Sequence, residues 1–412
     1  MRILHTSDWH LGRALEGRSR QAEQEDFVEE LCSICEDEKV DLVLVAGDVF
    51  DTFNPSAQAE ELYYRALDTL TAGGNRAVVV IAGNHDSPDR LRAVAPLAMR
   101  RGAFIMGLPR ETVAGPISES QIILHGSGPG WLELGVPGCL ETAVVSALPY
   151  PSEARLQQVL SAELSELNLR EAYSAAVGSL MSRQAELFRE ETINLAVSHL
   201  YVCGGAVSDS ERPIELGGAY SVQAGHVAVG AQYTALGHLH RAQRAGLDET
   251  SVHYSGSPLA YSFSEAGHSK SVNIIEVRPG RKALVKVFPL SSGIPLERWT
   301  CLHGVQEAVH RLEALDGRMV WLDLDIHSPR YLSAAELTQL RLAHSGTVNI
   351  RCTLTGDRDM ALAESLSDLS MAEMFARFYR HRRQGTEPSQ DLVRLFGELA
   401  DRVAVEEAGV GQ

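Results

Sequence analysis

Short apolar runs alternate with amphipathic segments along the first 110 residues of the chain. Strands that are buried on both faces read as continuous apolar runs, whereas surface helices repeat apolar residues with a period near 3.6. By these criteria the strands are predicted at residues 2–6, 40–46 and 76–82, and the helices at 20–38, 57–72 and 89–101. This βαβαβα order predicts an α/β fold with a parallel sheet.

The pattern changes after this region and divides the rest of the chain. Residues 103–150 are rich in Gly, Pro and Val, as in more exposed sheet. A polar helical segment at 152–190 precedes two further buried runs at 193–200 and 232–240, and the apolar alternation ends near residue 277. We therefore predict a main domain over 1–278, a small mixed α/β domain over 279–358, and a linker with two amphipathic helices over 359–412.

Composition limits the possible classes of protein. With 412 residues, 44% apolar content and a formal net charge of −17, the chain can bury a large core but lacks the overall positive charge of a nonspecific nucleic-acid binder. A local basic groove remains compatible with this balance.

The apolar runs are shorter than a membrane span and no secretory leader is recognisable, so the expected location is the cytoplasm, without membrane association. The six cysteines form no disulfide framework.

Each predicted buried strand is followed by side chains that can bind a metal ion. The motifs are SDWH, VAGDVFD, AGNHDS, VSHL and LGHLH, and their candidate residues are Asp8, His10, Asp48, Asn84, His85, His199, His238 and His240. Because the carboxyl ends of parallel strands meet at one edge of a sheet, side chains from separate strands can gather there. Any one of them alone is more often a turn residue or a buried, hydrogen-bonded imidazole. Their repeated placement after apolar runs predicts a shared site.

The chemistry of this set indicates which ions it would bind. Two divalent ions about 3.5 to 4 Å apart need a bridging carboxylate, and Asp48 is the natural bridge. Asp8 and His10, with one of the late histidines, would complete the shell of one ion. Asn84 and His199, with the other late histidine, would complete the second. Mixed nitrogen and oxygen donors favour manganese, iron or zinc over magnesium, and the absence of cysteine argues against a structural zinc site.

Taken in order, D-x-H, G-D, G-N-H-D, a strand-ending H and G-H-x-H resemble the motifs of the calcineurin-type metallophosphoesterase superfamily. Within it, the stretches MRILHTSDWHLG, VAGDVFDT, AGNHDS, TALGHLHRAQ and YSGSP closely resemble a family of bacterial nuclease subunits related to the double-strand-break repair nuclease of archaea and eukaryotes. The resemblance implies a four-layer α/β/β/α sandwich with two Mn²⁺ ions, a small capping domain, and C-terminal helices that bind an SMC-like ATPase. It also implies a homodimer through the helices near 57–72 and 89–101, whose apolar faces could equally pack inside one subunit.

The resemblance further implies a role for each site residue. One ion would be held by Asp8, His10, Asp48 and His240, and the other by Asp48, Asn84, His199 and His238, with His85 left off the metals as the catalytic histidine. Two positions depart from the family pattern. Ser198 replaces the usual Gly, and Asp51 stands where archaeal and eukaryotic relatives carry a phosphate-contacting His. Protein phosphatases of the superfamily use an Asp there to orient the catalytic histidine, and we assign that role to Asp51 as a hypothesis.

By the same resemblance the reaction is metal-dependent hydrolysis of DNA phosphodiesters in repair, recombination and replication, by a double-strand exonuclease that is also a hairpin and single-strand endonuclease. Hydroxide would attack in line, and His85 would protonate the leaving 3′ oxygen. Candidate contacts to the DNA backbone are Arg13, Arg18, Arg20, Arg241 and Arg244, although each fits a solvated loop as well. The chain has no G-x-x-x-x-G-K-[ST] motif, so any ATP would be bound by the partner.

Two other functions remain open on the sequence alone. The same metal site could serve a cyclic-nucleotide or other small-molecule phosphodiesterase, or a protein phosphatase. The predicted capping domain and terminal helices argue against a minimal enzyme of that kind. A non-catalytic scaffold could also keep the fold, but such proteins lose metal ligands, and none is missing here.

Overall fold

The computed structural model of the chain describes residues 1–115, 119–152, 166–211, 221–246 and 251–355, with 375, 379, 388–390 and 392–396. Its contacts separate two compact units. The first unit consists of Met1–Trp299, Gly317–Asp323 and Gly346–Asn349, and the second of Thr300–Asp316, Leu324–Ser345 and Ile350–Gln412. All residues of the predicted metal site belong to the first unit.

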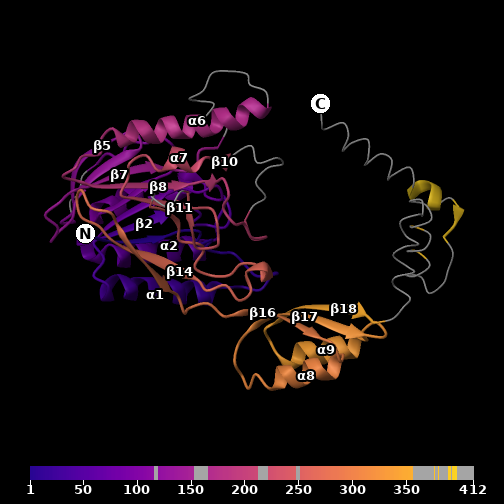
Figure 1. The fold of residues 1–412 in the computed structure, drawn as a ribbon. Helices are drawn as coiled ribbons and strands as arrows, with labels where there is room; N and C mark the ends of the chain where they lie inside the picture. Colours follow the sequence, from indigo (N-terminus) through magenta and orange to yellow (C-terminus); the bar gives the residue numbers. More distant parts are fainter. Residues whose placement is uncertain are drawn as a thin grey trace. The chain divides into compact units, whose positions relative to one another are not determined.

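The first unit is built on two sheets, and one of them contains the strands predicted near the N-terminus (Figure 1). Its order is β15 (Leu284–Pro289), β14 (Ser271–Glu276), β1 (Arg2–Thr6), β2 (Leu42–Ala46), β3 (Ala77–Ile81) and β4 (Ala103–Met106). The strands from β1 to β4 are parallel, whereas β14 and β15 pair antiparallel. This sheet therefore continues past residue 278, where we placed the end of the main domain. The sequence pattern predicts a strand within residues 279–295, and β15 is that strand, but its half-exposed edge position gives no sign that it joins this sheet.

The second sheet receives the later buried runs. Its order is β12 (Gln243–Ala245), β13 (Val252–Tyr254), β11 (Tyr233–Gly237), β8 (Ile193–His199), β7 (Ala143–Leu148), β6 (Trp131–Gly135) and β5 (Ile123–Gly128). The central strands β7, β8, β11 and β13 are parallel, and β5, β6 and β12 pair antiparallel at the edges. The short strands β9 (Tyr201–Val202) and β10 (Ser221–Val222) pair with each other. Both sheets thus have parallel strands whose carboxyl ends can present ligands.

Helices cover the outer face of each sheet. On the first sheet, α1 (Gln21–Asp37) and α2 (Ala57–Leu70) share an apolar cluster with alternate strand residues such as Val43 and Val78. The intervening residues, such as Leu44 and Val79, lie with Leu195 in a cluster between the two sheets. On the second sheet, α6 (Glu166–Ala185) and α7 (Ala224–Val227) cover the far face (Figure 1). This arrangement confirms the α/β/β/α sandwich.

The single helix predicted at 89–101 is wrong, because the segment is broken. It consists of α3 (Pro88–Arg92), α4 (Ala95–Ala98) and the 3₁₀ turn η2 (Met99–Arg101). Pro96 has no amide hydrogen, and its ring clashes with the carbonyl group four residues earlier, so a continuous helix cannot pass through it. The other 3₁₀ turns in the described part are η1 (Ala72–Gly74) and η3 (Phe263–Glu265).

A small sheet with two helices follows the sandwich along the chain. Its strands are β16 (Leu296–Cys301), β17 (Trp321–Ser328) and β18 (Thr347–Leu354), and its helices are α8 (Val305–Glu313) and α9 (Ala334–Ala343). Helix α9 begins with a capping box, in which Ser333 and Glu336 each accept a hydrogen bond from the other's main-chain amide. These elements occupy the region predicted as mixed α/β, and the division of the chain into three domains remains a prediction.

The two amphipathic helices predicted within 359–412 lie almost entirely outside the described residues. Of the residues described there, Phe375 and Phe396 stack with their ring centroids 4.2 Å apart. Both belong to the predicted apolar faces, so these faces touch at this point. Among the residues that the structure describes, no helix is long and apolar enough to cross a membrane.

Candidate metal centre

Polar residues that follow β1, β2 and β3 meet those at the ends of β8 and β11. Gly237 pairs with His199, so the two strands of the second sheet end side by side. The Nδ1 atom of His199 lies 2.9 Å from the carbonyl oxygen of Ala46, the last residue of β2, and this contact joins the two sheets at their carboxyl edges. The structure therefore gathers the candidate ligands of both sheets into one site.

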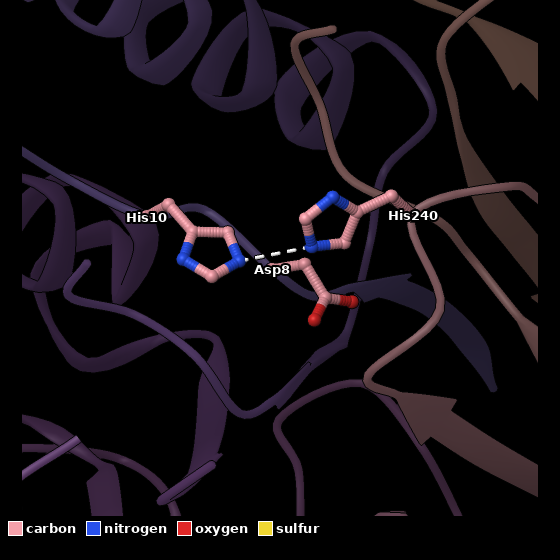
Figure 2. A group of neighbouring side chains, drawn as sticks. All are labelled: Asp8, His10 and His240. Atoms are coloured by element: carbon pink, nitrogen blue, oxygen red, sulfur yellow. Dashed lines mark hydrogen bonds between the residues drawn. The ribbon is translucent and has the colours of Figure 1, made fainter. Parts of the chain in front are cut away.

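The first group of donors consists of Asp8, His10 and His240, drawn in Figure 2. Their candidate ligand atoms all lie within 4.8 Å of one another, and all three residues are buried. The Nε2 atoms of His10 and His240 face each other at 3.0 Å. Asp48 borders this group, with its Oδ2 atom 3.8 Å from Nε2 of His10.

The second group is centred on Asn84. Its Oδ1 atom lies 2.9 Å from Nε2 of His199 and 3.1 Å from Nδ1 of His238. The Oδ2 atom of Asp48 is 3.4 Å from the same Nε2 atom of His199. One oxygen of Asp48 thus lies beside donors of both groups, as a bridging ligand must.

These distances fit donors that share ions. Two donors that bind one ion at about 2.1 Å, at right angles, lie about 3 Å from each other. The His10–His240 and Asn84–His199 pairs have donor atoms 3.0 and 2.9 Å apart. Buried carboxylates and imidazoles are also costly to desolvate unless they are paired or bind a metal. The residues present therefore fit a pair of divalent cations.

The charges of the cluster also favour cations. Burial raises the pKa of Asp8 to about 7. Burial would lower the pKa of His199, but the Asp48 carboxylate outweighs this effect and raises it to about 9. Burial likewise opposes the ionisation of Asp48, yet the charge of His199 holds the pKa of Asp48 well below its ordinary value. The proton on His199 supplies positive charge between two carboxylates, and a divalent ion that binds there would release it.

The backbone at the site is unusual. Of the nine non-glycine residues with positive φ in the described part of the chain, four are candidate ligands: Asp8 (55°), His10 (45°), Asp48 (50°) and His238 (106°). Non-glycine residues rarely adopt a positive φ, and those that do so cluster at functional sites. The sequence pattern gives no sign of this feature, which supports the site independently of any resemblance.

The glycines in the G-D and G-N motifs leave room for neighbouring ligands. A β-carbon on Gly83, which precedes Asn84, would lie 2.1 Å from Oδ1 of Asp48. A β-carbon on Gly47 would lie 2.5 Å from Nδ1 of His199, and this glycine has a φ of +88°. A larger residue at either position would displace a candidate ligand.

Sequence reasoning misses Asp86, the last residue of G-N-H-D. It is fully buried, and its carboxylate accepts hydrogen bonds from the main-chain amides of Val49, Phe50 and Gly83 at 3.2, 2.9 and 2.8 Å. These bonds tie the loop after β2 to the loop after β3. Burial raises the pKa of Asp86 to about 6. The one signal in the sequence is a carboxylate placed directly after two candidate site residues.

The YSGSP motif supports both loops that carry the first group. Oγ of Ser255 lies 2.9 Å from Oγ of Ser7, which in turn donates to the Asp8 carboxylate at 2.5 Å. The main-chain amide of Ser257 donates to the carbonyl oxygen of His240 at 3.2 Å. The motif therefore acts by holding ligand loops.

His85 lies at the edge of the cluster. Its Nε2 atom is 4.0 Å from Oδ2 of Asp48, and its Nδ1 atom is 2.7 Å from the main-chain carbonyl oxygen of Asp51. The Asp51 carboxylate points toward other groups, with Oδ1 3.5 Å from Nδ1 of His10 and 3.6 Å from Nη1 of Arg13. Asp51 therefore holds His85 through its main-chain carbonyl, and one of its carboxylate oxygens also lies within 4.8 Å of a ring nitrogen of His85.

Four of the five arginines predicted to contact DNA are available at the surface. Arg13 is half-buried beside the site, where it donates to the carbonyl oxygen of Ser210 at 2.8 Å and lies 5.2 Å from the ring centroid of Tyr261. Arg18, Arg241 and Arg244 are exposed. These four remain candidates for phosphate contacts.

The predicted DNA contact of Arg20 is wrong, because this side chain is only 1% exposed. Its guanidinium donates to the Glu23 carboxylate at 2.6 Å and to the carbonyl oxygen of Ala260 at 2.8 Å. Glu23 is itself buried and also accepts a hydrogen bond from Nε1 of Trp321 at 3.0 Å. Arg20 therefore neutralises an internal carboxylate.

Arg20→Ala should destabilise the fold, whereas Arg13→Ala should weaken DNA binding. Removal of the Arg20 guanidinium leaves Glu23 without its buried cation, a change that costs about 3 kcal/mol. Urea denaturation should show this loss for Arg20→Ala alone, and the KM for DNA should rise only for Arg13→Ala. Wild-type stability of Arg20→Ala would contradict the buried ion pair.

Comparison with known proteins decides the family. Residues 1–154 match the family model described as calcineurin-like phosphoesterase. The chain is 43% identical over 408 residues to SbcD of Bacillus subtilis (strain 168), one of the subunits of the nuclease SbcCD, with 99% of this chain and 100% of the relative covered. The chain belongs to the SbcD family of nuclease subunits.

Two other members of the SbcD family give the same picture. The Escherichia coli (strain K12) protein is 31% identical over 407 residues, which cover 96% of this chain and 97% of the relative. The Rhodobacter capsulatus protein is 34% identical over 302 residues, which cover 72% and 71%. The likeness to the Bacillus and Escherichia proteins includes the second unit and is not confined to the phosphoesterase region.

Proposed function

We propose that the chain is a metal-dependent nuclease that hydrolyses phosphodiester bonds of DNA, with Mn²⁺ as its ion, as a double-strand exonuclease and a hairpin and single-strand endonuclease. The main support is one observation: Asp48 lies between two groups of candidate donors, in a chain that resembles SbcD proteins along its whole length. The mixed nitrogen and oxygen donors suit manganese. We also propose that the protein acts in the cytoplasm, because its proposed substrate is DNA and its proposed partner uses ATP.

The residues of the site would divide the chemistry as follows. When bound, divalent ions supply Lewis-acid stabilisation of phosphate oxygens and make water a stronger nucleophile at neutral pH. His85 donates its Nδ1 proton to the carbonyl oxygen of Asp51, which leaves Nε2 directed toward the cluster. We assign this nitrogen, protonated in the imidazolium form of His85, as the general acid that gives its proton to the leaving 3′ oxygen and leaves the neutral Nδ1–H tautomer. The guanidinium of Arg13 can bind a backbone phosphate with two hydrogen bonds.

The substrate class can be tested with three substrates in parallel: linear duplex DNA, a DNA hairpin, and bis-p-nitrophenyl phosphate as a small ester. Each is assayed with Mn²⁺ or EDTA, with and without the SbcC-type ATPase and ATP. We expect Mn²⁺-dependent cleavage of both DNAs with a kcat/KM above that of the small ester. Hydrolysis of the small ester alone, with DNA intact even beside the partner, would favour a small-molecule phosphodiesterase.

We propose a homodimer that forms through α2 and α4. A surface hollow of about 140 Å³ between these helices is lined in part by Tyr64, Leu67 and Leu97. Tyr64 is 36% exposed and Leu97 is 65% exposed. Exposed apolar side chains around a hollow are typical of a protein interface, and a second copy of the chain could bury them.

Leu97→Glu should convert the dimer into a monomer, because it places a charge in the proposed apolar contact. Sedimentation equilibrium measures the mass of the variant and of the wild type. Leu342→Glu is the matched control, because Leu342 on α9 is 82% exposed and lies outside the proposed interface. A dimeric Leu97→Glu protein would contradict this interface.

We propose that the segment 359–412 binds the SbcC-type ATPase. Met371 and Met374, which carry part of its apolar pattern, lie outside the described residues. Met and Phe at helical spacing suit a helix that binds in a partner's groove. The name of the Bacillus relative, which describes one component of a complex, also supports a partner.

Removal of the residues from 368 onward should abolish assembly with the ATPase and leave the metal site working. The sandwich that holds the site is formed by residues before this point, so the truncated chain should stay folded and hydrolyse bis-p-nitrophenyl phosphate with Mn²⁺. Co-purification with the ATPase measures assembly. Unfolding of the truncated chain, or full partner binding, would show that the segment has another role.

A further inference from the structure

Lys270 is the centre of a largely buried hydrogen-bonded group that contacts the candidate ligand His240. Its side chain is 11% exposed, and it is one of four lysines in a chain that has 37 basic residues. The ammonium group donates to the carbonyl oxygen of His240 at 3.1 Å and to Oγ of Ser257 at 2.9 Å. Its third partner is the carboxylate of Glu265. All three of its protons therefore have acceptors.

Glu265 connects this ammonium group to the imidazole of His240. Its side chain is 1% exposed, and its Oε1 atom lies 3.9 Å from Nδ1 of His240. Oγ of Ser210 lies closer to the same ring nitrogen, at 2.6 Å. The carboxylate of Glu211 accepts the main-chain amide of His240 at 2.8 Å. His240 is thus held at its amide, its carbonyl and the ring nitrogen that faces away from His10.

These contacts decide which lone pair His240 offers to a metal. A histidine ligand whose outer nitrogen donates a hydrogen bond is fixed in one tautomer and one ring orientation. Here the Ser210 hydroxyl can accept a proton from Nδ1, and the Glu265 carboxylate behind it favours this tautomer over one in which the serine donates. The lone pair of Nε2 then faces His10, on the side of the proposed ion (Figure 2).

We propose that Lys270 and Glu265 are positioning residues of the metal centre, which hold His240 so that its Nε2 atom binds the ion shared with Asp8 and His10. The inference rests on the proposed two-ion site and adds the residues that preorganise one half of it. Lys270 also neutralises Glu265, which would otherwise be a buried, unpaired charge.

The geometry explains why this position carries lysine in a chain whose basic residues are mostly arginine. An ammonium group directs three donors tetrahedrally from one atom, whereas a guanidinium is planar, larger and directs its donors in a fork. The three acceptors around Nζ of Lys270 belong to three separate segments of the chain. Arginine at this position would keep the charge but could not satisfy the same three acceptors.

The test compares Lys270→Met, Lys270→Arg and Glu265→Gln with the wild-type chain. Mn²⁺ binding to the metal-stripped proteins is measured by electron paramagnetic resonance, and kcat and KM for bis-p-nitrophenyl phosphate are measured at saturating Mn²⁺. Each variant should bind one of the two ions about 10- to 100-fold more weakly. We expect kcat to fall while KM changes by less than about twofold, because His240 would orient the ion rather than hold the substrate.

Lys286→Met is the matched control, because Lys286 is 63% exposed and pairs with Glu38 on the surface. It should bind both ions with wild-type affinity.

If Lys270→Met binds both ions as tightly as the wild type, the inference is overturned while the proposed metal site stands. If Lys270→Met does not fold, Glu265→Gln decides in the same way, since it keeps the shape of the side chain. Full rescue by Lys270→Arg would overturn the requirement for an ammonium group. A wild-type chain that binds fewer than two ions would instead contradict the proposed function.

Discussion

Asp48→Ala should lose both metal ions and, with them, nearly all hydrolysis. The Oδ2 atom of Asp48 lies 3.8 Å from Nε2 of His10 and 3.4 Å from Nε2 of His199, so this one oxygen serves both groups of donors. Its removal also takes away the carboxylate that stabilises the charge on His199. We expect a Mn²⁺ titration of the metal-stripped variant to show no tight site, and DNA cleavage to fall by several orders of magnitude.

Asp89→Ala is the matched control for this variant. Asp89 lies only a few residues after the candidate ligands of β3, in the first turn of α3, and it is exposed. It should bind two ions and cleave DNA like the wild type. Occupancy of two tight sites in Asp48→Ala would contradict the bridge, and the loss of a single ion would make Asp48 a ligand of one site only.

His85→Ala should separate binding from chemistry. Because Nε2 of His85 is 4.0 Å from Asp48 and we place the residue outside both metal shells, the variant should keep two ions and bind DNA. Loss of a general acid should lower kcat by roughly 10²- to 10⁴-fold. Mn²⁺ stoichiometry and single-turnover cleavage of DNA, measured on the same preparation, check both expectations. Loss of an ion in this variant would show that His85 is a ligand.

Asp51→Ala distinguishes the two contacts made by Asp51. The main-chain carbonyl that holds Nδ1 of His85 is retained in this variant, whereas the carboxylate beside Nδ1 of His10 is lost. We therefore expect weaker Mn²⁺ binding and, at saturating Mn²⁺, a smaller loss of kcat than for His85→Ala. If Asp51→Ala and His85→Ala lose kcat equally at saturating Mn²⁺, the carboxylate of Asp51 is what orients His85.

The parts of the site that could be predicted from the sequence have local causes. Asp8, Asp48 and Asn84 each follow a short apolar run, and a parallel sheet brings such positions to one edge whatever the details of packing. The apolar runs themselves located β1, β2 and β3 closely, since these three strands are buried on both faces. The order of these motifs was therefore enough to indicate both the fold and the cluster.

The parts that could not be predicted depend on distant partners or on backbone torsions. Arg20 shares a loop with Arg13, but its burial depends on Ala260, which lies 240 positions away along the chain. Lys270 resembles any surface lysine until the fold brings the carbonyl of His240 to its ammonium group. Whether Asp51 uses its carbonyl or its carboxylate depends on the local backbone, which residue types do not reveal.

The central proposal is that the candidate ligands at the strand ends bind two ions and cleave DNA. The most direct test measures DNA cleavage against the number of Mn²⁺ ions bound per chain. Metal-stripped protein is titrated with Mn²⁺, and bound metal and cleaved hairpin DNA are determined in the same samples, with the SbcC-type ATPase and ATP present. We expect cleavage to rise as occupancy approaches two ions, to vanish with EDTA and to return when Mn²⁺ is restored. Cleavage at an undiminished rate without bound metal, or two bound ions with no cleavage, would contradict this assignment.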